Sequence, residues 1–73
     1  MNENVTQMLT NLTASYLDEA QVCGQFRAVV MGECLTAGST AFLANPDEQA
    51  GRCDAQDAVV KMLDFMLDNP AEK

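Results

Sequence analysis

The sequence contains no histidine, and its titratable chemistry is correspondingly poor. Histidine is the side chain most often used for proton transfer near neutral pH, and it is the commonest metal ligand. Three cysteines without a histidine do not make a favourable metal site. Neither Ser39 nor the cysteines have a base beside them that would activate a nucleophile. We therefore expect a protein that is not an enzyme and carries no cofactor.

Positive charge is also scarce, because four lysines and arginines stand against eleven aspartates and glutamates, for a net charge of −7. Nucleic acids and anionic membranes bind positive patches, so both are disfavoured as direct partners. A helix-turn-helix regulator, kept as an alternative, would need a basic recognition helix. The basic residues are instead scattered, at Arg27, Arg52, Lys61 and Lys73. The charge favours a protein partner with a basic surface.

The cysteine count is odd, and no secretory signal follows Met1, which together indicate a reducing, cytoplasmic location. Buried cysteine is the commonest state of such thiols, and a redox role is the minor alternative. A membrane span is disfavoured because Arg27 and Glu33 interrupt the most apolar stretch, and the uncharged run after Glu33 is shorter than the ~20 residues that a span needs.

That apolar stretch, residues 25–44, predicts the central helix of a small all-α domain. At roughly 100° per residue its apolar side chains fall on two nearly opposite sides. The first side carries Phe26, Val30, Cys34, Ala37 and Ala41. The second side carries Ala28, Met31, Leu35 and Phe42, which we expect to meet another helix or to mediate self-association. Gly32 would allow a close backbone approach, and Gly38 equally well ends the helix.

An amphipathic helix precedes this stretch, beginning at a capping-box pattern formed by Asn4 and Gln7. Its apolar side is predicted to hold Val5, Met8, Leu9, Leu12, Tyr16, Ala20 and Cys23. Gly24 is a natural end for this helix. The alternative is a single bent rod that continues through Gly24.

The C-terminal part predicts a helix from about residue 55 to Asp68, with a short helical piece before it that starts with Asn45 as cap and Pro46 in the first position. One kinked helix over residues 46–68 is the competing interpretation. Its core side carries Ala55, Val59, Met62, Leu63 and Met66. A charged stripe with a projecting aromatic ring lies opposite and is our candidate partner surface, formed by Asp54, Asp57, Lys61, Asp64, Phe65 and Asp68. A merely solvated helix face is the alternative for this stripe.

At 73 residues the chain predicts one domain, a compact bundle of three to four short helices that homodimerisation could complete. The function that fits best is a small acidic interaction module that docks on a larger protein as inhibitor, regulator or chaperone. This profile is typical of small bacterial or phage regulators.

The segment Pro46 to Ala50, together with the length and acidity, resembles acyl carrier proteins. The resemblance implies a helical domain that carries phosphopantetheine on the serine of an Asp-Ser-Leu motif. The nearest triplet here is Glu33-Cys34-Leu35, in which a cysteine replaces that serine. A carrier-like domain without the usual serine motif is therefore the second alternative function.

Overall fold

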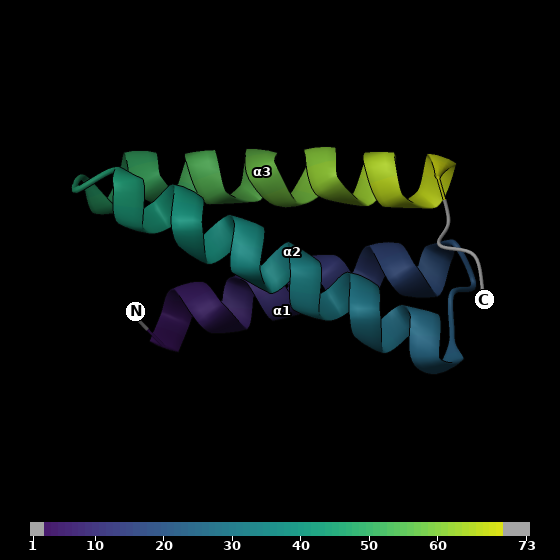
Figure 1. The fold of residues 1–73 in the computed structure, drawn as a ribbon. Helices are drawn as coiled ribbons and strands as arrows, with labels where there is room; N and C mark the ends of the chain where they lie inside the picture. The colour runs from purple at the N-terminus through teal and green to yellow at the C-terminus, as the bar shows by residue number, and fades with distance from the viewer. Residues whose placement is uncertain (1–2, 70–73) are drawn as a thin grey trace.

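The computed structural model describes residues 3–69, which form three helices. They are α1 (Glu3–Glu19), α2 (Gly24–Ala44) and α3 (Glu48–Asp68). In Figure 1, α1 and α3 run from left to right and α2 runs from right to left, so α2 is antiparallel to both. The bundle is elongated, with extents of 38 × 18 × 16 Å. The all-α prediction is confirmed, with three helices in the described part of the chain.

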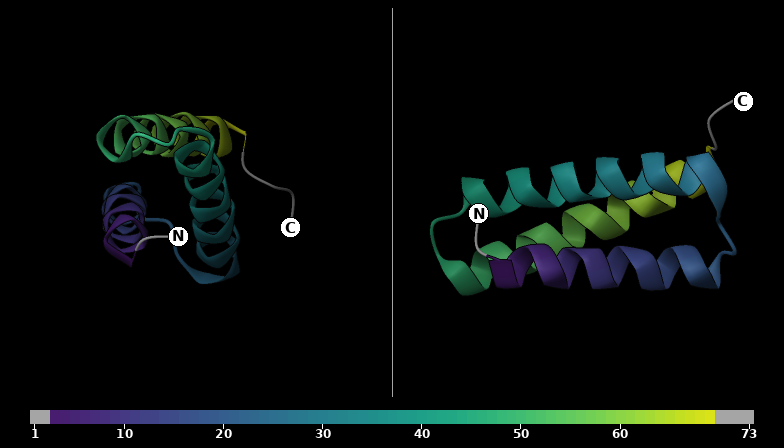
Figure 2. Two further views of the ribbon diagram at one scale, coloured as in Figure 1. Left: turned by 90° about the vertical axis from the view of Figure 1, so that its left-hand side faces the viewer. Right: turned by 90° about the horizontal axis from the view of Figure 1, so that it is seen from below.

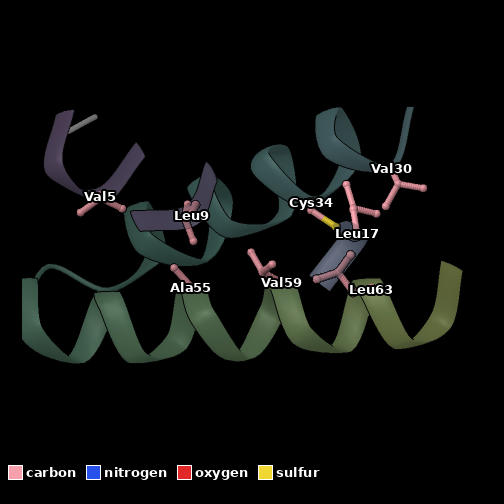
Figure 3. Close-up of a cluster of buried hydrophobic side chains, with 8 residues drawn as sticks. All are labelled: Val5, Leu9, Leu17, Val30, Cys34, Ala55, Val59 and Leu63. Atoms are coloured by element: carbon pink, nitrogen blue, oxygen red, sulfur yellow. The ribbon is translucent and has the colours of Figure 1, made fainter. Parts of the chain in front are cut away.

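Each helix contributes a buried stripe whose members are four residues apart, at Val5, Leu9, Thr13 and Leu17 of α1, Val30, Cys34 and Gly38 of α2, and Gly51, Ala55, Val59 and Leu63 of α3. Figure 3 shows side chains from all three helices meeting in one interior. A four-residue row is inclined to the helix axis, so helices that bury such rows cross obliquely. Figure 2 shows α3 crossing the α1–α2 pair in this way.

The buried side of α1 differs from the predicted one. Tyr16 is 37% exposed, and Ala20 and Cys23 are exposed. A four-residue row drifts by about 40° at each step, which carries the stripe away from Tyr16 and onto Leu17. Thr13 is tolerated in the core because its Oγ1 donates a hydrogen bond to the Leu9 carbonyl at 2.8 Å.

The helix α1 ends in a hydrogen-bonded turn, so the single bent rod is wrong. The Val22 amide donates to the Leu17 carbonyl at 2.9 Å, and the Gln21 amide donates to the Asp18 carbonyl at 3.1 Å. These two bonds make a Schellman motif, with Gln21 at the left-handed position (φ 59°) where glycine is usual. Gly24, with φ 71°, is the first residue of α2 and not the end of α1.

All three helices meet at Gly38 of α2. A β-carbon there would lie 2.7 Å from Leu9 Cδ1 of α1 and 3.0 Å from Val59 Cγ2 of α3. Gly38 is therefore a contact residue in the middle of α2, and the expectation that it ends the helix is wrong. A β-carbon at Gly32 would meet no atom of residues 3–69 within 4 Å, so the described helices do not make the close approach expected there.

The last helix is one continuous element, close to the kinked-helix interpretation, but it starts later than predicted. Asp47 is the N-cap, and its Oδ1 accepts a hydrogen bond from the Ala50 amide at 3.0 Å. Asn45 supports this turn, because its Oδ1 accepts from the Asp47 amide at 3.1 Å. The helix passes through Gly51, where a β-carbon would lie 2.8 Å from the Phe42 ring of α2. Gly51 is therefore needed for packing and does not break the helix.

We predict that Gly38→Ala makes the protein about 1–3 kcal/mol less stable than Gly32→Ala, because only the first substitution overpacks the core. Both gain the same helix propensity, so the difference isolates the steric effect. Urea unfolding of dilute samples followed by circular dichroism measures it. Equal stability of the two variants would contradict the close approach at Gly38.

A second prediction concerns the turn after α1. Gln21→Gly should raise the free energy of unfolding by about 1 kcal/mol, because glycine adopts a left-handed backbone without the steric penalty that glutamine incurs. The control is Gln7→Gly in the exposed interior of α1, which should lower it by about 0.5–1 kcal/mol. Thermal unfolding of both variants decides the matter, and a destabilised Gln21→Gly protein would refute the turn geometry.

Candidate functional site

The predicted stripe occupies the outward side of α3. We call it the acidic α3 surface; it comprises Asp54, Asp57, Lys61, Asp64, Phe65 and Asp68, all of them exposed. The fold produces it because α3 buries the opposite row, from Gly51 to Leu63. Its charged residues recur every three or four positions, which keeps them on one side of a helix.

Three members of this surface have partners within the chain. Lys61 Nζ lies 3.0 Å from Asp57 Oδ2, with 77% and 63% of the two side chains exposed. An exposed pair of this kind contributes little to stability and separates readily. The Asp54 carboxylate accepts a hydrogen bond from Asn45 Nδ2 at 2.9 Å, which ties the start of α3 to the preceding turn. Within residues 3–69, Asp64 and Asp68 make no ion pair.

Phe65 is the largest apolar side chain on this surface, and 64% of it is exposed. Its backbone is fixed, because the amide and the Nδ2 of Asn69 both donate to the Phe65 carbonyl at 3.0 Å. Lys61 and Asp68 lie one turn before and after it on the same side of α3. An exposed aromatic ring surrounded by charged side chains is the usual composition of an interface anchor and its rim.

Three of the four residues predicted for self-association are partly covered by their own chain. Met31, Leu35 and Phe42 are half-buried and pack against the core of their own chain, while Ala28 is exposed. The contact between Phe42 and Gly51 shows that α3 is the neighbour covering this side. The fold thus uses three of the four residues inside the molecule.

The exposed apolar side chains of α2 are ones that the sequence analysis did not single out. Val29 is 47% exposed and Leu43 is 69% exposed. Both lie roughly opposite the buried row of Val30, Cys34 and Gly38 on a helix of 3.6 residues per turn. Their position opposite the core could have been found only after the buried row was known.

The three thiols do not form a reactive pair. All are free; Cys34 is buried, whereas Cys23 and Cys53 are exposed. Cys23 precedes α2, whereas Cys53 lies in the second turn of α3, near the opposite end of α2. The 21 residues of α2 span about 30 Å, and the few residues of α3 before Cys53 recover only a small part of it, so the two exposed thiols are far beyond the reach of a disulfide. Burial, and after it the carboxylate of Glu33, raises the pKa of the Cys34 thiol from 9.0 to about 11. Cys34 is therefore a core residue.

The basic side chains of the described residues are all engaged by carboxylates. Arg27 Nη1 lies 2.9 Å from Asp18 Oδ1 and also donates to the Val22 carbonyl at 3.1 Å. Arg52 lies 3.6 Å from Glu48, and Lys61 pairs with Asp57 as above. Lys73 lies outside the described residues. The described part of the chain therefore presents no unpaired basic row of the kind that a recognition helix needs.

No group of three or more metal-ligating side chains comes together in residues 3–69. Over the same range, every helix is too short or too polar to cross a membrane.

Comparison with known proteins gives no relative: neither a protein-family model, nor a curated protein, nor a solved structure matches this chain.

We predict that Cys23 and Cys53 react with a thiol reagent in the folded protein at pH 8, whereas Cys34 stays unmodified. A raised pKa keeps the Cys34 thiol neutral at that pH, and burial keeps the reagent out. Mass spectrometry after alkylation should find two labels in the native state and three in guanidinium chloride. Labelling of Cys34 without unfolding would show that the core opens there.

Proposed function

We propose that this chain is a small, non-enzymatic interaction module that docks on a larger protein and acts as an inhibitor, regulator or chaperone. The acidic α3 surface would make the contact, and the partner would present a basic surface with a recess for an aromatic ring. The observation that carries the proposal is Phe65, exposed over 64% of its area among carboxylates. We further propose that the module acts in the cytoplasm, as a homodimer.

The electrostatics of α3 support a basic partner. Asp64 and Asp68 stand in the last turns of the helix, where carboxylates oppose the dipole by about 0.3–1 kcal/mol. A lysine or arginine from a partner would be attracted by these carboxylates and by the negative helix end together. Since neither aspartate has an ion-pair partner among residues 3–69, a cation would displace nothing but water.

The ring of Phe65 supports a specific contact over a diffuse one. Charge alone gives attraction that depends strongly on salt, whereas an aromatic side chain that enters a recess gives most of the affinity of a typical interface.

Phe65→Ala should weaken partner binding by about 30-fold or more, the effect of losing about 2 kcal/mol at an anchor residue. It should change the free energy of unfolding by less than about 0.5 kcal/mol, because the ring is mostly exposed. The measurement is quantitative affinity capture from host lysate with wild type and variant side by side, paired with urea unfolding.

The matched control separates this surface from net charge. Asp64→Lys and Glu19→Lys change the charge equally, and Glu19 is an exposed carboxylate on α1. A true partner is lost with Asp64→Lys and Phe65→Ala but retained with Glu19→Lys. Equal retention by all variants, or equal loss with both lysine variants, would reject the proposed contact.

A further inference from the structure

A second surface, on the side of α2 away from the core, is left uncovered by the other described residues. We call it the outer α2 face; it comprises Val29, Gly32, Thr36, Thr40 and Leu43, with the Glu33 carboxylate at its edge, all of them exposed. In Figure 2, viewed along the bundle, α2 stands to one side of both α1 and α3. This side of α2 therefore faces away from the other two helices.

The composition of the outer α2 face is not explained by the fold of one chain. Leu43 and Val29 expose 69% and 47% of their area, and both would be more stable covered. Gly32 destabilises an exposed helix by about 1 kcal/mol relative to alanine, and no part of the described structure lies within 4 Å of where its β-carbon would be. Gly38, by contrast, is required by two buried neighbours. Gly32 suits a close approach from outside.

The order of residues along this face is symmetric about Thr36. Gly32 and Thr40 lie four residues from it, and Val29 and Leu43 lie seven residues from it. A second α2 that packs antiparallel across a two-fold axis at Thr36 would set Val29 of each copy against Leu43 of the other. The small residues Gly32 and Thr40 would meet between the axis and these pairs. Val29 and Leu43 would then cover each other, and the smaller residues near the axis would let the two α2 backbones approach closely.

The distribution of charge also favours a second copy on this face. Helix α2 carries a single carboxylate, the exposed Glu33, and its one basic residue, Arg27, pairs with Asp18 of α1. Helix α1 carries three carboxylates and no basic residue, and α3 carries five carboxylates against two basic residues. Two molecules of net charge −7 repel each other least when they meet through α2, which keeps the carboxylates of α1 and α3 apart.

We propose that the outer α2 face binds a second copy of this chain, antiparallel and with the two-fold axis at Thr36. The contact would be isologous, as in most homodimers. This inference rests on one part of the proposed function, that the protein forms a homodimer. It is independent of the acidic α3 surface, which would stay exposed on the outside of the dimer.

The first test introduces a carboxylate at the axis. Thr36→Glu would place two like charges against each other in the dimer, and Gln56→Glu adds the same charge on the exposed side of α3 as a control. Sedimentation equilibrium over a range of concentrations should show wild type in a monomer–dimer equilibrium. The dissociation constant should rise about 10-fold or more for Thr36→Glu and stay within about two-fold for Gln56→Glu. Circular dichroism checks that both variants keep their helices.

A second test fixes the register by cross-linking in a Cys23→Ser, Cys53→Ser background. Thr36→Cys should form a disulfide dimer on mild oxidation, because a residue on the axis meets itself, whereas Gln56→Cys should not. Val29→Cys and Leu43→Cys should cross-link when the two variants are mixed and not when each is alone. Cross-linking of Val29→Cys alone would indicate a parallel pair and overturn the register.

A wild-type protein that stays monomeric at every concentration would overturn the inference altogether. So would a Thr36→Glu variant that dimerises like wild type. Either result would leave the acidic α3 surface untouched, since the Phe65→Ala and Glu19→Lys comparison does not depend on dimerisation. Conversely, a failed Phe65→Ala experiment would leave this interface standing.

Discussion

The close approach at Gly38 is the constraint on which the rest of this bundle depends. Helix α2 lies against α1 through Leu9 and against α3 through Val59 at the same residue. The missing side chain lets one helix contact two others in a chain with little material for a core. A second close approach, of the Phe42 ring over Gly51, holds α2 and α3 together near their connection. Two glycines thus determine where the helices can cross.

The helices could be predicted from the sequence because their apolar periodicity and polar ends are strong local signals. The apolar stretch of residues 25–44 agrees with α2 to within one residue, and the core side of α3 was predicted correctly. The roles of Gly38 and Gly51 could not be predicted, since a helix break and a tight contact have the same sequence signature. The stripe of α1 was placed wrongly after Leu12, because its course depends on the angle at which α1 meets its neighbours.

The same limit applies to the functional surfaces. The sequence placed the aspartates and Phe65 on one side of α3, and they are exposed there. Periodicity also showed that α2 is apolar on more than one side, but it could not tell which side another helix covers. In the structure Met31, Leu35 and Phe42 are half-buried against the core, whereas Val29 and Leu43 are exposed. Only the relative placement of the three helices contains that information.

The separation of charge between helices gives the molecule a permanent electric dipole. The negative charge is concentrated on α1 and α3, and α2 carries little net charge. The electric field of a basic protein would rotate this molecule as the two approach. The carboxylates would then face the basic protein, and α2 would face away from it. This orienting torque acts within a Debye length, about 8 Å at physiological ionic strength. Added salt would therefore lower the rate of association with a basic partner at concentrations too low to weaken the bound complex.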